Sequence, residues 1–68
     1  MPSIRITTAS LNEDVKNELI KAITTSIHSA TQVPKEFIHV IIDIVGDDNY
    51  AVGGKTVREI KKTMNPIS

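Results

Sequence analysis

The segment FIHVIIDIV at residues 37–45 constrains the fold of this chain more than any other. Its β-branched, nearly continuous apolar character is typical of a strand that is covered on both faces, as parallel strands usually are. His39 and Asp43 interrupt one face of this strand, which they share with Ile41 and Val45. The chain must therefore supply a second, parallel strand and a cover for each face of the sheet.

Residues 2–8 supply the second strand. Pro2, Ile4 and Ile6 alternate with polar residues, which is the pattern of a strand with one apolar face. Between the strands, Ser10 and Glu13 match a capping box, in which each side chain satisfies an unpaired amide at a helix start. We therefore predict a strand that opens at Pro2 and a helix that follows the capping box.

The predicted helix begins near Leu11 or Asn12 and runs to about Thr31, with apolar residues at helical spacing along one face. Strand, helix and strand form a right-handed crossover, so the two strands are parallel. The fold class is thus α/β (α+β), built on a single β-α-β unit.

The C-terminal third predicts an arm and a short helix. Residues 46–49, GDDN, are turn formers, and residues 50–54, YAVGG, indicate a short extended piece with a flexible glycine corner, as in a small hairpin or arm. A second capping box, TVRE at 56–59, starts a helix that Pro66 ends. We interpret residues 1–68 as a single domain.

The length of the chain limits its core. A domain of 68 residues buries only about 60% of the surface that its unfolded chain exposes. The chain has no cysteine and no His/Asp/Glu cluster at metal-ligand spacing, so we expect no metal and no other cofactor. One helix covers only one face of the sheet, and a second copy of the chain is the expected cover for the face that carries His39.

Charge and hydropathy argue against two classes of partner. Lysine plus arginine equals aspartate plus glutamate at 8 each, so no overall field attracts nucleic acid or an anionic membrane. The N-terminus lacks the apolar stretch of a secretory signal, and no segment approaches the ~20 apolar residues of a membrane span. We expect a cytoplasmic protein with no nucleic-acid or membrane partner.

Pro2 is the first candidate for catalysis. If Met1 is removed, Pro2 becomes a free secondary amine, which no internal residue provides. An α-amino group titrates at about pH 7.7–8.0, and burial in an apolar pocket lowers its pKa, which favours proton transfer near neutral pH. A small residue after methionine also simply permits trimming, so the Met-Pro start alone does not establish catalysis.

Three further motifs have simpler explanations beside functional ones. The sequence GKT at 54–56 lacks the earlier glycine of a phosphate-binding loop, because Asn49 stands there, so we reject nucleotide binding. His39 is either a satisfied interface histidine or a hydrogen-bond donor in a pocket. For Asp43 an ion pair between subunits is the better explanation, and Arg5 and Arg58 are assigned no role.

Together these features resemble the 4-oxalocrotonate tautomerase family. The resemblance rests on the Met-Pro start, the β-α-β pattern and the sequence YAVGG at 50–54, and it spans nearly the whole chain. It implies an isomerase in which the N-terminal proline interconverts the enol and keto forms of a small 2-hydroxydienoate or 2-oxo acid. It also implies a homo-oligomer, commonly a hexamer built as a trimer of dimers, with pockets at subunit boundaries.

By position, the resemblance implies that Pro2 is the catalytic base and acid, and that His39 and Tyr50 bind the substrate. Tyr50 falls where the family commonly has a phenylalanine that keeps the pocket dry, and its phenol adds a hydrogen-bond donor. The family's two pocket arginines are missing, since ASLN at 9–12 and His39 stand in their places. Imidazole does not replace the bidentate grip of a guanidinium on carboxylate, so we expect dicarboxylates to bind poorly.

Two alternatives remain open at this point. A proline-dependent hydratase or dehalogenase-like lyase needs a carboxylate to activate water, and Asp43 is the only candidate on its face. A non-catalytic oligomeric binding module would keep the architecture after loss of the arginine clamp. Retention of Met1, or an unaffected rate after Pro2→Ala, would argue against the tautomerase.

Overall fold

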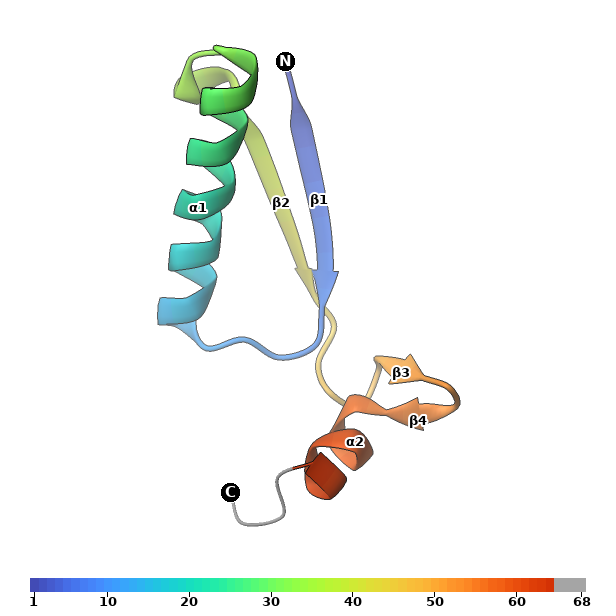
Figure 1. Cartoon of the computed structure of the whole chain (residues 1–68). Helices are drawn as coiled ribbons and strands as arrows, with labels where there is room; N and C mark the ends of the chain where they lie inside the picture. Colours follow the sequence, from blue (N-terminus) through green and yellow to red (C-terminus); the bar gives the residue numbers. More distant parts are fainter. Residues whose placement is uncertain (65–68) are drawn as a thin grey trace.

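The computed structural model describes residues 1–64 and consists of a body and an arm (Figure 1). The body contains β1 (Ser3–Thr8), α1 (Glu13–Thr31), a short 3-10 helix η1 (Lys35–Phe37) and β2 (His39–Ile44). The arm, residues 50–64, contains β3 (Ala51–Val52), β4 (Lys55–Thr56) and α2 (Val57–Met64). The predicted helix end at Pro66 lies outside the described residues.

β1 and β2 pair in parallel, with a register that runs from Ser3 opposite His39 to Thr8 opposite Ile44. The predicted β-α-β unit is therefore confirmed. Both strands begin slightly later than predicted, because Pro2 has no N–H for the ladder and because Phe37 belongs to η1. The first link between the strands is the amide of His39, which donates to the carbonyl of Pro2 at 3.0 Å.

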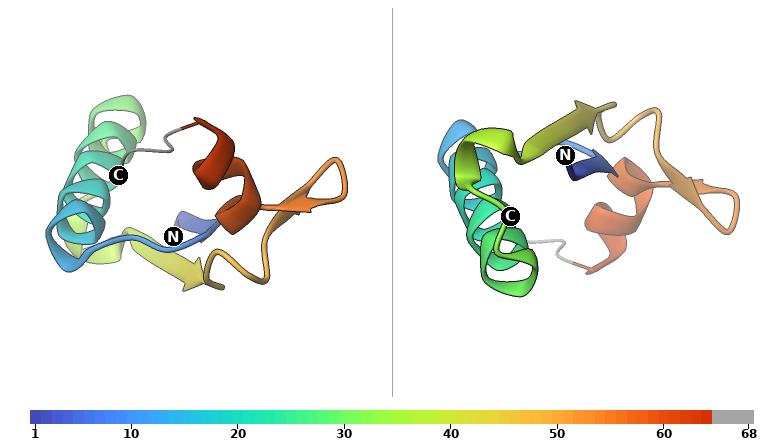
Figure 2. Two further views of the ribbon diagram at one scale, coloured as in Figure 1. Left: turned by 90° about the horizontal axis from the view of Figure 1, so that it is seen from below. Right: turned by 90° about the horizontal axis from the view of Figure 1, so that it is seen from above.

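The two faces of the sheet differ in cover. α1 lies along one face (Figure 2), and side chains alternate between half-buried and exposed along β1 and along β2 as far as Ile42. The half-buried set contains Ile4, Ile6, Val40 and Ile42, while the opposite set contains the exposed Ser3, Arg5, His39 and Ile41. The open face is thus the one that carries His39 and Asp43, for which the sequence predicted cover by a partner.

The start of α1 corrects one sequence prediction. Asn12, not Ser10, caps the helix, because the side-chain oxygen of Asn12 accepts from the amide of Val15 at 2.8 Å. Ser10 instead donates its backbone amide to Asp47 at 3.0 Å, and α1 begins at Glu13. The capping box at Ser10 and Glu13 was therefore wrong, since Asn12 is closer to the first turn and Ser10 is held by a distant carboxylate.

The arm follows the sequence more closely. Gly53 and Gly54 have φ values of 61° and 85°, which glycine adopts without strain, and they form the turn of the antiparallel hairpin of β3 and β4. The second capping box is also present, because the amide of Glu59 donates to the hydroxyl of Thr56 at 3.3 Å. The Glu59 carboxylate accepts from that same hydroxyl rather than from the Thr56 amide.

The single chain is far from compact. Its radius of gyration is 15.1 Å, with extents of 43 × 22 × 17 Å, whereas a compact domain of this length has a radius of about 11 Å. Within residues 1–64 no side chain is fully buried. Large apolar side chains that remain exposed include Val15, Phe37, Ile41, Ile44 and Val52. Exposed apolar surface of this kind is typical of an interaction surface. No helix in this part of the chain is both long and apolar enough to cross a membrane.

Candidate functional site

Pro2 lies at the entry to β1, at the end of the body opposite the arm (Figure 1). It is half-buried, and its carbonyl is held by the backbone amide of His39 at 3.0 Å. Met1, which precedes it, is 81% exposed. The backbone of Pro2 is thus held at the start of β1, and the side of Met1 is open to solvent.

The backbone of His39 lies beside that of Pro2, but the side chains of the two residues do not lie together. The register pairs His39 with Ser3, so these two side chains share the open face of the sheet. Alternation places Pro2, with Ile4 and Ile6, on the face that α1 covers. Within one chain the imidazole and the proline ring thus project to opposite sides of the sheet, and a pocket lined by both needs two copies.

Tyr50 is separated from both of these residues. It precedes β3 in the arm, where its carbonyl accepts from the amide of Val57 at 2.7 Å. Figure 1 shows the arm at one end of the chain and the N-terminus at the other. The structure therefore brings the backbones of Pro2 and His39 together and places Tyr50 at a distance from both within one chain.

The structure differs from a second sequence prediction, which concerns the ion-pair partner of Asp43. Its carboxylate accepts from Arg5 of the same chain, with Nη1 and Oδ2 3.0 Å apart. The partner was expected in another subunit, but Arg5 lies diagonally opposite Asp43 on the open face, because the register pairs Arg5 with Ile41 and Thr7 with Asp43. One oxygen of Asp43, Oδ2, is thus engaged by the Arg5 guanidinium of the same chain.

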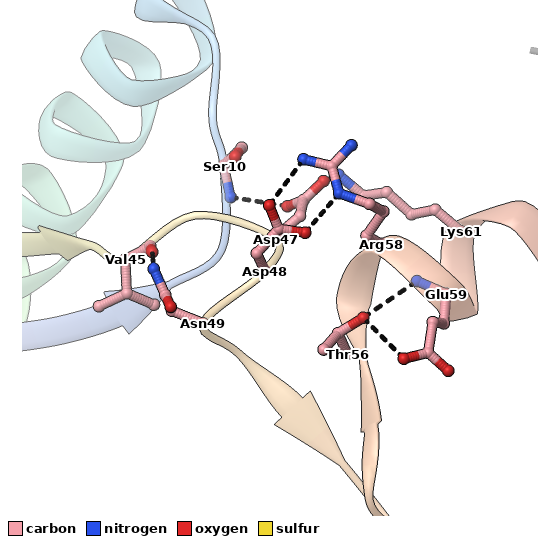
Figure 3. A network of polar contacts seen from close by, with 9 residues as sticks. All are labelled: Ser10, Val45, Asp47, Asp48, Asn49, Thr56, Arg58, Glu59 and Lys61. Carbon is pink, nitrogen blue, oxygen red and sulfur yellow. Dashed lines mark hydrogen bonds and ion pairs between the residues drawn. The ribbon is translucent and has the colours of Figure 1, made fainter.

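The arm is attached by four charged residues and one serine amide, which the sequence did not identify as a unit (Figure 3). We call it the carboxylate clasp, and it consists of Ser10, Asp47, Asp48, Arg58 and Lys61. Asp47 accepts from the amide of Ser10 at 3.0 Å and from Nζ of Lys61 at 2.9 Å. Asp48 accepts from Nε of Arg58 and from Nη2, the latter at 3.1 Å.

Electrostatics keep the clasp ionised. The amide of Ser10 and the ammonium of Lys61 lower the pKa of Asp47. Hydrogen bonds from Arg58 lower the pKa of Asp48, and Asp48 in turn raises the pKa of Arg58. The sequence signal for this group was present in the adjacent acidic pair at 47–48 and in two cations one helical turn apart at 58 and 61.

Both arginines of the chain, Arg5 and Arg58, are therefore engaged in ion pairs. Arg5 gives one donor, Nη1, to Asp43, and Arg58 gives two, Nε and Nη2, to Asp48. Within residues 1–64, no three His, Asp or Glu side chains form a group that could hold a metal ion. At the N-terminal end of the sheet, the structure thus brings together Pro2 and the backbone of His39.

Comparison with known proteins was made for sequence and for structure. The family described as "Tautomerase enzyme" matches residues 2–60. No curated protein matches the chain.

Solved structures resemble the chain over nearly their whole length. TomN, described as a 4-oxalocrotonate tautomerase homologue in the tomaymycin biosynthetic pathway, is 27% identical with a TM-score of 0.78, over 96% of this chain and 98% of TomN. A 4-oxalocrotonate tautomerase isozyme from Methylibium petroleiphilum has the same identity and TM-score, 27% and 0.78, over 87% of this chain and 97% of its own. A heterohexamer 4-oxalocrotonate tautomerase from Chloroflexus aurantiacus J-10-fl is 30% identical with a TM-score of 0.78, over 88% of this chain and 98% of its own.

Proposed function

The chain belongs to the tautomerase family, and from this premise we propose that it is a keto-enol tautomerase with the amine of Pro2 as general base and acid. Its substrate is a small enol or 2-oxo acid. The active form is a homo-oligomer, expected as a hexamer of three dimers, in which His39 and Tyr50 line pockets between copies.

The position of Pro2 is the observation that carries this proposal. Removal of the exposed Met1 gives a secondary amine at the start of β1, and the hydrogen bond from His39 to the Pro2 carbonyl fixes its location. Half-burial on the side of α1 disfavours the charged amine and lowers its pKa, so a neutral base is available near pH 7.

The reaction needs one proton carrier. The neutral amine takes the proton of the enol hydroxyl, the oxygen forms a carbonyl, and the electron pair of the enol double bond moves to carbon. The protonated amine then gives the same proton to that carbon. Amine and substrate regain their charge, so the cycle balances without an electron acceptor, and Tyr50 of a neighbouring copy keeps water from the amine.

The ion pairs of the two arginines bear on how many carboxylates the substrate carries. Because Arg5 and Arg58 are both engaged in ion pairs, a carboxylate meets single hydrogen bonds rather than a bidentate clamp. Acids with one carboxylate are therefore favoured over dicarboxylates. The ion pair between Arg5 and Asp43 also weighs against the lyase alternative, since that carboxylate is not free to activate water.

Two measurements test the proposal. Intact mass of the protein from its native host should lack Met1. Pro2→Ala should slow ketonisation of phenylenolpyruvate and 2-hydroxymuconate by about 10²- to 10⁴-fold, whereas Ser3→Ala, the neighbouring change on the open face, should not. Equal rates for Pro2→Ala and the parent would exclude Pro2 as the base. No turnover by a parent protein with a free Pro2 amine would favour the non-catalytic binding module.

A further inference from the structure

We propose that the carboxylate clasp is a positioning device, which aims the arm so that Tyr50 of one copy reaches the Pro2 end of another copy. The inference rests on the proposed function, because it assigns Tyr50 to a pocket completed by Pro2. It goes further in naming the residues that set the direction of the arm.

The clasp lies where the arm meets the body. Asp47 is only 16% exposed at its side chain and bonds to both sides, with the amide of Ser10 in the body and Lys61 of α2 in the arm. Its own carbonyl also accepts from the amide of Arg58 at 3.3 Å. Asp48 adds the two-pronged pair with Arg58 (Figure 3). One short turn thus fixes α2 relative to the loop before α1.

The elements of the body and those of the arm pack mainly among themselves. β2 packs against β1 and α1 in the body, and β4 packs against β3 and α2 in the arm. The carboxylate of Asp47 joins the two parts, since it bonds to the amide of Ser10 and to Lys61. Directional bonds to this carboxylate therefore contribute to the direction of the arm.

Tyr50 lies two residues beyond the last acidic residue of the clasp. The side-chain amide of Asn49 donates to the carbonyl of Val45 at 2.9 Å, and the carbonyl of Tyr50 accepts from the amide of Val57 at 2.7 Å. The backbone of Tyr50 thus lies between two held points, the turn of the clasp and the first residue of α2. Because the arm lies at the opposite end of the chain from the N-terminus (Figure 1), Tyr50 can meet a Pro2 amine only in another copy.

Tyr50 also provides the readout. It is the only tyrosine, and the chain has no tryptophan, so intrinsic fluorescence reports on this side chain alone. We would compare the parent, Arg58→Asp, the charge swap Asp48→Arg with Arg58→Asp, and Asp47→Ala. Glu13→Gln is the matched control, because it breaks an ion pair of comparable length, 2.7 Å to Lys16, within α1 and away from the arm.

In the assembled parent, Tyr50 should be shielded from acrylamide. Arg58→Asp and Asp47→Ala should expose it and lower turnover by about 10²-fold, the order of loss for a group displaced by about 1 Å. The acid limb of the kcat/KM profile should move to higher pH, because water at the pocket raises the pKa of the Pro2 amine. The charge swap should restore both quenching and rate, and Glu13→Gln should change neither.

The two proposals fail in different ways. If the parent turns substrate over and depends on Pro2, but Arg58→Asp and Asp47→Ala keep parental quenching and rate, the clasp does not position Tyr50. If the swap fails to restore what Arg58→Asp loses, the ion pair is not the cause. If no protein shows turnover, the proposed function fails, while clasp-dependent quenching would still tie Tyr50 to the clasp.

Discussion

The body and the arm are held by different forces. In the body, alternating apolar residues of two paired strands face α1, and the hydrophobic effect selects that arrangement without regard to exact side-chain geometry. In the arm, a two-residue hairpin and a short helix are too small to form a core, and charged bonds from Asp47 and Asp48 fix them. The arm therefore responds to charge changes that leave the body intact.

This difference divides the candidate site. The body carries Pro2 and His39, joined by one backbone hydrogen bond. The arm carries Tyr50, whose position is set by the clasp. On the proposed function, proton transfer depends on the body, and shielding from water depends on the arm that the clasp joins to it. Changing each part separately tests whether the body and the arm control different properties of the site.

We expect the greatest loss of activity when the amine of the body is blocked and the arm is left unchanged. An N-terminal extension joined to Pro2 turns the secondary amine into a tertiary amide, which is not a base. Activity should fall by about 10²- to 10⁴-fold, with Tyr50 quenching unchanged. Protease cleavage directly before Pro2 should restore the rate. Full activity with the extension in place, verified by mass spectrometry, would rule out the amine.

His39→Arg tests whether the open face of the body contributes to the pocket of a neighbouring copy. An added guanidinium should lower KM for 2-hydroxymuconate by roughly 10- to 150-fold, the worth of about 1.5–3 kcal/mol for a charge-assisted contact. KM for phenylenolpyruvate, with one carboxylate, should fall less. Asn17→Arg is the control, since it adds the same charge at an exposed position of α1. An unchanged KM would place position 39 outside the pocket.

Acid should separate the arm from the body. The folded pKa values of Asp47 and Asp48 are lowered, so the clasp is fully present above the ordinary aspartate pKa of about 3.9 and is lost as the pH falls through the lower folded values. The groups that act on Asp47 and Asp48 are Arg58, Lys61 and Lys62 of α2 and each other, and the donor from the body is the uncharged amide of Ser10.

Below about pH 4, Tyr50 should become accessible to acrylamide while the far-ultraviolet circular dichroism of α1 persists. Apolar contacts of the body do not titrate, so its transition should come at lower pH. Coincident transitions of the two signals would contradict independent control of the arm. An Asp48→Asn variant should shift only the fluorescence transition.

The sequence predicted the body well because its signals are local. Period-two alternation at 2–8, helical spacing after Asn12 and the apolar run at 37–45 each indicate one element, and the right-handed crossover rule then makes the strands parallel. The hydrogen bond between Pro2 and His39 follows from that pairing. Strand ends were less accurate, because η1 takes up Phe37.

Contacts between distant residues could not be predicted in the same way. The pair of Arg5 and Asp43 depends on a register that periodicity alone leaves open, and an inter-subunit partner was expected instead. The clasp depends on how the chain turns after β2, because Asp47 bonds to residues 37 positions before it and 14 positions after it. The separation of Tyr50 from Pro2 has the same origin, since the direction of the arm is a property of the clasp.

The smallest expected effect concerns the loop that joins the body to the clasp. Asn12→Ala should lower the free energy of unfolding by about 1 kcal/mol, because the amide of Val15 loses its cap. Ser10→Ala should change it by less than about 0.5 kcal/mol, since only the backbone amide of Ser10 bonds to Asp47. Urea unfolding at one fixed protein concentration measures both, because the stability of an oligomer depends on concentration. An equal loss for Ser10→Ala would mean that the Ser10 hydroxyl caps α1 in solution. The amide of Ser10 would then be turned away from Asp47, and the clasp would lose its hydrogen bond to the body.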